Sequence, residues 1–234
     1  YEGGTSSQRF ARITEDPNDA GNKVLHYWLN EAYIPYGDNK LKGRIQATIQ
    51  GNAINRVTIK TRLFLHDDFN ALATAPETFS WLTIQEFWND PVDEEFPFRI
   101  SVNIVKPNAS QDGLYFKAHG QTKVPNQEAW EDVWSVTDDT FAIPIAEWFT
   151  IETYFKEGDI NTGKFQVNIT DSHGVSHKVI DVTDYTYHPG DLSPDGLNKF
   201  NPMKLYAPER LITPMNDIGK TLQLYWDDLK LWIN

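Results

Sequence analysis

Three consecutive strand-like segments, at 79–88, 97–105 and 113–121, carry polar and aromatic side chains at alternate positions. Because a strand points successive side chains to opposite faces, each segment should contribute one row to a core and one row to the surface. The predicted surface rows contain Trp81, Thr83, Gln85, Phe87, Arg99, Ser101, Asn103, Tyr115, Lys117, His119 and Gln121. Amide, guanidinium, imidazole and phenol groups can bond sugar hydroxyls, and flat rings can cover sugar C–H faces. The pattern therefore predicts a carbohydrate-binding surface.

Lysis of a uronate glycan needs a partner for the carboxylate, a base for the C5 proton and an acid for the leaving oxygen. On the predicted surface, Gln85, Arg99 and Asn103 could bind the carboxylate. His119 and Tyr115 could carry out the proton transfers. The other candidates for substrate binding supply positive charge, or rings at a rim: Lys60, Arg62, Lys117, Tyr154, Tyr187 and His188. The alternative interpretation is a solvated sheet face with ordinary alternation of charges.

Hydrolysis of a glycan would instead need two carboxyl groups about 5–10 Å apart. The candidates for such a pair are Glu86 and Glu152. Glu86 falls among the apolar positions of its segment, where a carboxylate needs a partner or has a raised pKa. Glu86 is therefore either a structural hydrogen-bond anchor or a tuned acid, and anchoring is the simpler interpretation.

The chain of 234 residues is acidic, with a formal net charge of −12, and contains no cysteine. The charge argues against a nucleic-acid partner, because phosphate contacts need clustered Lys and Arg. It argues more weakly against a polyanionic glycan, since local charge can override the net value. The lack of cysteine excludes disulfides, thiol catalysis and Cys-ligated metals. No run of about 18 apolar residues occurs, so no membrane-spanning segment is predicted.

The elements that must position these side chains form a series of strand patterns separated by Gly, Pro, Asn and Asp, typical of an all-β sandwich. We predict strands at 8–14, 23–30, 41–50, 56–65, 79–88, 97–105, 113–121, 148–156, 163–170, 177–182 and 221–232. Two short helices are predicted, near 76–79 and 208–212. The Pro-rich stretch 188–214 is interpreted as a long loop between strands, a type of loop that is often functional. Because no linker or repeat is visible, we expect one domain over 1–234.

Three stretches give the chain a resemblance to the concanavalin A-like lectin/glucanase superfamily. They are the opening at 16–26, the Trp-bearing hairpin at 145–169 and the closing strand at 224–232, which together span nearly the whole chain. The resemblance implies an all-β, two-sheet antiparallel jelly-roll sandwich with a concave face that holds glycans. It is specific for the fold and says little about activity.

Within this superfamily, the order of the segments is most similar to heparin-lyase-like and alginate-lyase-like polysaccharide lyases. Those families place a Gln-x-His on one concave strand, an Arg on another and a Tyr-x-Lys nearby. Here Gln-Glu-Phe at 85–87 stands at the Gln-x-His position, so Phe87 replaces the expected His. The Tyr-Phe-Lys-Ala at 115–118 looks like the corresponding motif of alginate lyases, although it lies in the middle of this chain.

The resemblance also suggests a structural calcium ion, because many jelly-roll carbohydrate proteins hold this ion between a final-strand Asp and an N-terminal loop. The ligands here would be Asp227 and Asp16, with Asn18 completing the site. The alternative is an aspartate that anchors the N-terminal loop through backbone N–H groups. No cofactor is expected to be required.

These observations together predict an exported protein, either secreted, periplasmic or at the cell surface, with a signal peptide already removed. We expect it to bind a polysaccharide or oligosaccharide on its concave sheet, with lyase-type β-elimination as the leading chemistry. A noncatalytic, lectin-like glycan-binding module is the main alternative. Two further alternatives are a glycoside hydrolase that uses Glu86 and Glu152, and a purely structural surface protein. Whether the chain is an enzyme stays open at this point.

Overall fold

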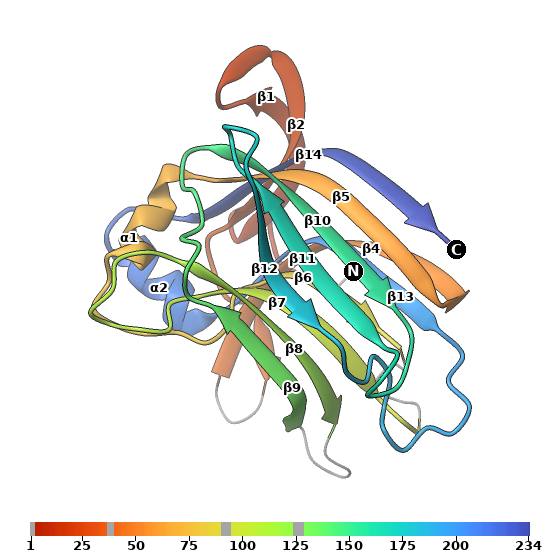
Figure 1. Cartoon of the computed structure of the whole chain (residues 1–234). Coiled ribbons are helices and arrows are strands. Elements are labelled where there is room, and N and C mark those ends of the chain that lie inside the picture. Colours follow the sequence, from red (N-terminus) through yellow and green to blue (C-terminus); the bar gives the residue numbers. More distant parts are fainter. Residues whose placement is uncertain (1–2, 37–39, 90–94, 124–128) are drawn as a thin grey trace.

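The structure is a computed structural model that describes residues 3–36, 40–89, 95–123 and 129–234. Within these ranges the chain forms two antiparallel sheets of seven strands, packed face to face (Figure 1). Sheet A contains, in chain order, β1 (Arg9–Asp16), β2 (Asp19–Leu29), β5 (Arg56–Leu65), β10 (Trp148–Lys156), β11 (Lys164–Thr170), β12 (Ser176–Val182) and β14 (Leu222–Ile233). Sheet B contains β3 (Ile34–Tyr36), β4 (Lys40–Ile54), β6 (Thr83–Trp88), β7 (Phe98–Val105), β8 (Tyr115–Lys123), β9 (Trp130–Asp138) and β13 (Leu197–Pro208).

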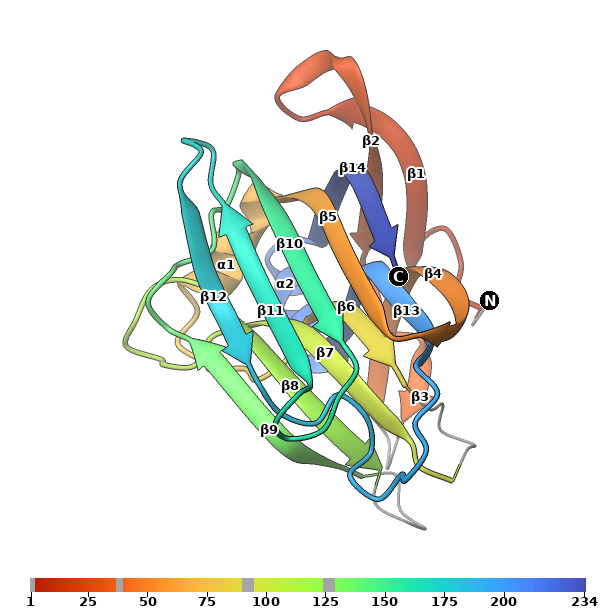
Figure 2. The same ribbon diagram turned by 45° about the vertical axis from the view of Figure 1, so that its right-hand side comes forward.

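The spatial order of the strands is β1-β2-β14-β5-β10-β11-β12 in sheet A and β3-β4-β13-β6-β7-β8-β9 in sheet B. Figure 2 shows the strands of sheet A lying over those of sheet B, with the β1–β2 hairpin extending beyond the sandwich. Short helices η1 (Asp67–Phe69), α1 (Asn70–Ala73) and α2 (Glu209–Asp217) complete the described elements. The helix predicted near 76–79 does not form, whereas α2 begins where the second helix was predicted. The all-β jelly-roll sandwich predicted from the sequence is confirmed.

The inward side chains of the two sheets form one hydrophobic core. Phe87 of β6 packs between the sheets against Phe155 of β10 and Phe165 of β11, with ring centroids 6.2 and 5.3 Å apart. Each of these rings is at most 1% exposed. Burial of a side chain of this size stabilises the fold by about 1.5–3 kcal/mol. Phe87 therefore belongs to the core, and its predicted place on the outer row is wrong.

A β-bulge in β6 explains this error. Thr83 pairs with Asn103, but Gln85 pairs with the adjacent Val102, so Ile84 is an extra residue on β6. A bulge breaks the strict alternation of a strand, and residues beyond it change face. Glu86 consequently takes the outward position on sheet B.

Strand β13 lies in the middle of sheet B, between β4 and β6, although its residues were predicted to belong to the loop at 188–214. Pro202 obscured the pattern, because proline cannot donate a ladder hydrogen bond and is rare in central strands. In the structure Pro202 sits where the register of β13 shifts against both of its neighbours. Strand β13 therefore adds its outward side chains to the same face as β6, β7 and β8.

Candidate carbohydrate site on the outer face of sheet B

The outer face of sheet B contains a cavity of about 440 Å³, which we call the central cavity. Its lining is polar and aromatic: Tyr36, Lys42, Ser80, Trp81, Thr83, Arg99, Ser101, Asn103, Lys117, His119, Gln121, Trp130, Asp132 and Tyr206. Strand register explains how β7, β8 and β9 supply one continuous floor. Asn103 lies opposite Lys117, and Gln121 lies between Arg99 and Asp132. Four of the predicted site residues thus meet in one place, namely Arg99, Asn103, Lys117 and His119.

His119 and Asp132 form a pair at the β8–β9 side of the central cavity. His119 Nδ1 lies 3.1 Å from the Asp132 carboxylate, while Nε2 lies 3.3 Å from the amide nitrogen of Asn103. A carboxylate can only accept and an amide nitrogen can only donate, so we assign the ring proton to Nδ1 and the lone pair to Nε2. Burial lowers the pKa of His119, although the hydrogen bond to Asp132 acts in the opposite direction. The imidazole is therefore neutral at neutral pH, with a base at Nε2.

Asn103 is held in place from the other side of the floor. Thr83 Oγ1 donates a hydrogen bond of 2.8 Å to Asn103 Oδ1, and both side chains are buried. This bond orients the Asn103 amide group so that its nitrogen faces His119. Asp132, His119, Asn103 and Thr83 therefore form one polar row that crosses β9, β8, β7 and β6.

Arg99 is fixed between neighbours from three strands. Its Nε and Nη2 donate to Gln121 Oε1 at 3.1 and 2.9 Å, and its guanidinium lies 4.1 Å from the centroid of the Trp130 ring. On the other side, Nη1 is 3.5 Å from a carboxylate oxygen of Glu86. Stacking and bidentate bonding suit the planar guanidinium and restrict its motion. Arg99 therefore supplies fixed positive charge to the cavity.

Glu86 forms a buried ion pair with Lys204 of β13, below Arg99. Lys204 is completely buried and Glu86 is 2% exposed. Burial alone would raise the pKa of Glu86, but Lys204 and Arg99 outweigh this effect and lower the pKa to about 2. Glu86 is therefore an ionised anchor, as the structural alternative predicted, because a general acid needs a raised pKa.

Aromatic rings border the cavity on the β13 side. The rings of Trp81 and Tyr206 have centroids 5.1 Å apart at an angle of 50°. Lys42 Nζ lies 4.9 Å from the centroid of the Tyr36 ring and 5.3 Å from that of Tyr206. Tilted rings offer faces to sugar C–H groups, and the Tyr206 hydroxyl adds a hydrogen-bond donor at the same border. Tyr206 escaped the sequence analysis because β13 was not recognised as a strand.

The charge of the central cavity differs from that of the whole chain. Among the described residues, its lining contains the cations Lys42, Arg99 and Lys117 and a single carboxylate, Asp132. A second cavity of about 370 Å³ adjoins it at Trp130, and is also lined by the cations Arg44, Lys123 and Lys199 and by the carboxylate Glu86. The local field on this face is thus positive on a protein whose net charge is −12. Such a field attracts anionic ligands.

Two residues predicted to be catalytic, Gln85 and Tyr115, do not line the central cavity. Gln85 lies inside the sandwich, where it accepts a 2.6 Å bond from Thr153 Oγ1 and donates a 3.1 Å bond to the Pro202 carbonyl. Its predicted role in binding a substrate carboxylate is therefore wrong, because the β6 bulge turns it inward. Tyr115 is 4% exposed, its hydroxyl contacts the Gln111 amide, and it does not line the central cavity. The structure thus does not bring Tyr115 together with His119 in that cavity, and its role in proton transfer stays a prediction.

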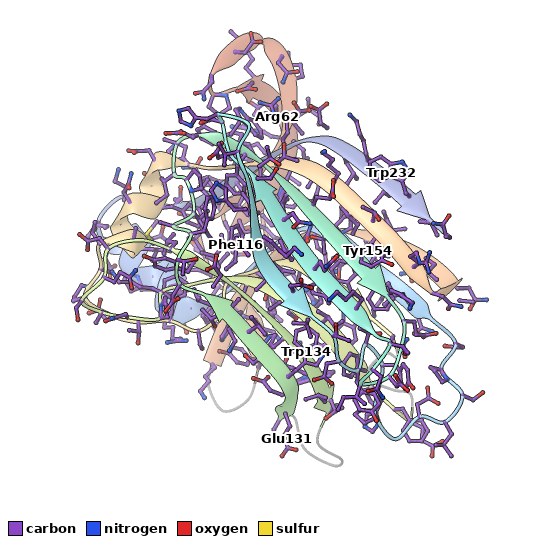
Figure 3. The ribbon with its side chains drawn as sticks, in the orientation of Figure 1. Arg62, Phe116, Glu131, Trp134, Tyr154 and Trp232 are labelled. Atoms are coloured by element: carbon purple, nitrogen blue, oxygen red, sulfur yellow. The ribbon has the colours of Figure 1, made fainter. Side chains whose placement is uncertain are left out.

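The predicted residues from sheet A lie on the other side of the sandwich. Lys60 and Glu152 form an exposed ion pair of 3.5 Å on β5 and β10. Arg62 stacks on Trp148, 4.6 Å from its ring centroid, and Tyr154 shares the outer face of β10 with Glu152 (Figure 3). These residues cannot take part in a site with His119. The proposed hydrolase pair of Glu86 and Glu152 is excluded in the same way, because the two carboxylates face opposite sides.

Tyr187 and His188 lie in the loop before β13 and do not line the central cavity. The Tyr187 ring packs against Tyr185 at 5.8 Å, and the His188 ring packs against Phe96 at 5.2 Å. His188 Nδ1 also accepts a bond of 3.0 Å from the Gly190 N–H. These contacts fit the interpretation that both side chains hold a loop, and a role in substrate binding stays a prediction.

Asp16 and Asp227 lie close together, as the calcium prediction required, but N–H donors occupy their oxygens. Asn22 Nδ2 bonds both carboxylates, at 3.3 and 2.9 Å, and Trp148 Nε1 donates to Asp16 at 2.9 Å. Asn18 contributes its backbone N–H to Asp16 rather than an oxygen ligand. Calcium needs free oxygen ligands, so this donor set fits the anchoring alternative better than a calcium site. Elsewhere in the described ranges, no group of three or more His, Cys, Asp or Glu that could hold a metal ion occurs.

No protein-family model matches the chain, and no curated protein matches it either. Solved structures of polysaccharide lyases share its fold. The endo-β-1,4-glucuronan lyase from Trichoderma reesei has a TM-score of 0.57 at 13% identity, over 97% of this chain and 88% of that chain. A double mutant of the alginate lyase Aly36B in complex with alginate tetrasaccharide has a TM-score of 0.55 at 11% identity, over 97% and 84%.

A third lyase structure agrees with these two. The PL-14 alginate lyase from Aplysia kurodai has a TM-score of 0.51 at 9% identity, over 95% of this chain and 87% of that chain. The shared fold confirms the predicted resemblance to the jelly-roll layout of polysaccharide lyases. Among the described residues, no helix is long and apolar enough to cross a bilayer.

Proposed function

We propose that the chain binds a uronate-containing polysaccharide in the central cavity and cleaves it by β-elimination. The observation that carries this proposal is the set of groups in that cavity. A neutral imidazole, a phenol and several cations line one cavity, on a fold shared with polysaccharide lyases. The positive local field favours an anionic glycan over a neutral one.

In the proposed reaction, the 3.3 Å hydrogen bond from the Asn103 amide to His119 Nε2 breaks when the substrate binds, and Nε2 takes the proton from C5 of a uronate unit. The released electron pair forms a C4=C5 double bond, the C4–O4 bond breaks, and the Tyr206 hydroxyl donates its proton to O4. Asp132 keeps the Nδ1 proton in place and so keeps the lone pair of His119 at Nε2. With His119 as the base and Tyr206 as the acid, the cavity supplies both groups that general acid–base catalysis needs.

The substrate carboxylate needs positive partners, because negative charge develops on it as C5 loses its proton. Lys117 lies opposite Asn103 in the β7–β8 ladder, beside the His119 row. Neither Lys117 nor Lys42 forms an ion pair with a carboxylate in the part of the chain that the structure describes. We propose that the substrate carboxylate binds Lys117 and the Asn103 amide nitrogen. A neighbouring sugar ring would pack on the face of Trp81.

The test is an assay of several polyuronates, including glucuronan and alginate, for the ultraviolet absorbance of the unsaturated product. We expect product with the wild-type protein on at least one polyuronate. His119→Ala and Tyr206→Phe should each reduce kcat by about 10²–10⁴-fold, the usual contribution of a positioned acid or base. Tyr154→Phe is the matched control, because it removes a phenol from the outer face of sheet A.

Affinity for polyuronates without any product would contradict β-elimination and favour the glycan-binding module. Activity that survives His119→Ala would contradict the role assigned to His119. We also propose that the protein acts outside the cytoplasm, because an intact polysaccharide does not cross a membrane.

A further inference from the structure

Two lysines, Lys106 and Lys204, are completely buried among the described residues. Lys204 has a counter-ion, because its ammonium group contacts the Glu86 carboxylate. Lys106 differs, since its ammonium group bonds the carbonyl oxygen of Ala73, and no carboxylate in the described ranges forms an ion pair with it. A buried ammonium group without a counter-charge is costly. Because its side chain is completely buried, Lys106 does not itself touch a ligand, but its uncompensated charge makes the surrounding region positive.

Lys106 lines a cavity of about 280 Å³, which we call the Lys106 cavity. Among the described residues, its lining contains the cations Lys117 and Arg210, the hydroxyls of Thr78, Ser80 and Thr137, and the buried Lys106. No carboxylate from the part of the chain that the structure describes lines this cavity. Ammonium, guanidinium and hydroxyl groups together form the donor set that binds carboxylate, sulfate or phosphate oxygens.

Several elements build this donor set. A short antiparallel bridge joins Phe79 to Lys106 through backbone bonds of 3.1 and 3.0 Å, which holds the segment before β6 against the end of β7. Lys117 and Thr137 lie opposite each other on β8 and β9. Arg210 comes from the first turn of α2. The site is therefore assembled from the segment before β6, the end of β7, and elements β8, β9 and α2.

The Lys106 cavity continues from the central cavity, because Ser80 and Lys117 line both. A glycan that is bound in the central cavity would reach the Lys106 cavity with its neighbouring sugar unit. We propose that the Lys106 cavity is a second anion-binding subsite, which takes the carboxylate or sulfate group of that neighbouring unit. This assignment rests on the proposed function for its substrate, but the donor set stands independently of catalysis.

The first test compares oligouronates of increasing length. We expect kcat/KM of the wild-type protein to rise when the oligosaccharide becomes long enough to fill both cavities. Arg210→Gln and Lys106→Met should each lower kcat/KM about tenfold for oligosaccharides that fill both cavities. Neither variant should change kcat/KM for the shortest substrates. Arg210 is exposed and Met keeps the apolar stem of Lys106, so both variants should fold. Lys178→Gln, on β12 of sheet A, is the control.

The second test measures binding by calorimetry, without relying on cleavage. A long oligouronate should bind Arg210→Gln about tenfold more weakly than the wild-type protein. Its carboxyl-reduced, neutral counterpart should bind both proteins equally. If no polyuronate is cleaved but this difference is observed, the proposed function fails while the subsite stands.

Three results would overturn the subsite. Cleavage could proceed with both variants equal to the wild-type protein at every substrate length. The neutral counterpart could show the same dependence on Arg210 as the charged oligosaccharide. Inorganic sulfate could bind in an Arg210-dependent way while oligouronates do not, which would assign the cavity to a free anion instead of a sugar-borne one.

Discussion

The outer faces of the two sheets carry similar polar residues in different surroundings. On sheet A, the side chains of Lys60 and Glu152 are 44% and 41% exposed, and water screens their ion pair. On sheet B, the side chains of Lys204 and Glu86 are 0% and 3% exposed, so their charges must be satisfied within the protein. Figure 3 shows Arg62, Tyr154 and Trp232 spread along sheet A. Polar alternation thus identifies an outward face, but burial distinguishes the floor of a site from a solvated surface.

The largest effect on stability should come from Glu86→Gln. This change leaves Lys204 and Arg99 buried without a full counter-charge, so the free energy of unfolding should fall by about 3–5 kcal/mol. Urea denaturation measures the loss. The double variant Glu86→Gln/Lys204→Met removes both charges and should recover part of it. A single variant as stable as the wild-type protein would contradict the importance of the buried pair.

This comparison also shows how far the sequence could predict the site. Strict alternation holds in β7 and β8, and it placed Arg99, Asn103 and His119 on one face, where they line one cavity. It failed in β6, because no local signal distinguishes a bulge at Ile84 from a regular strand. Alternation also cannot show to which of the two sheets a strand belongs. For this reason Lys60 and Tyr154, which lie on sheet A, were grouped with His119 of sheet B. Sheet membership depends on long-range pairing, which a single sequence does not reveal.

Asp132→Asn should reduce kcat by about a hundredfold, because the amide can no longer hold His119 in the required tautomer. Burial lowers the pKa of His119, so activity in the wild-type protein should fall only at pH values below the ordinary value of 6.5. Asp132 raises the pKa of His119, so Asp132→Asn should lower this pKa further. The remaining activity of the variant should therefore be lost at a lower pH than in the wild-type protein. A pH–rate profile for each protein provides the measurement. Glu152→Gln, on sheet A, should leave both kcat and the profile unchanged.

His26 offers a contrasting histidine in sheet A. Its ring stacks on Tyr225 at 4.2 Å, and burial, together with Arg12, lowers its pKa to about 4. Between pH 6.5 and 4 the unfolded state binds this proton more readily, so the protein loses stability as the pH falls through that window. His26→Phe keeps a ring and should reduce this acid-induced loss by about 2 kcal/mol. Thermal unfolding of both proteins at pH 7 and pH 4 measures the effect. An equal loss of stability in the wild-type protein and in His26→Phe would contradict the prediction.

The smallest effect should come from Lys60→Met. Its exposed pair with Glu152 should contribute less than about 1 kcal/mol, and salt should reduce even that. Denaturation at low and high salt measures the contribution. A loss comparable to that of Glu86→Gln would show that the two faces do not differ in the way described.

The most direct measurement is a crystal structure of the His119→Ala variant with a bound oligouronate. The account predicts sugar density along the outer face of sheet B, with a uronate carboxylate at Lys117 and Asn103 and with C5 facing the position of the missing imidazole. Density on the outer face of sheet A, near Tyr154 and Trp232, with the central cavity empty, would contradict it.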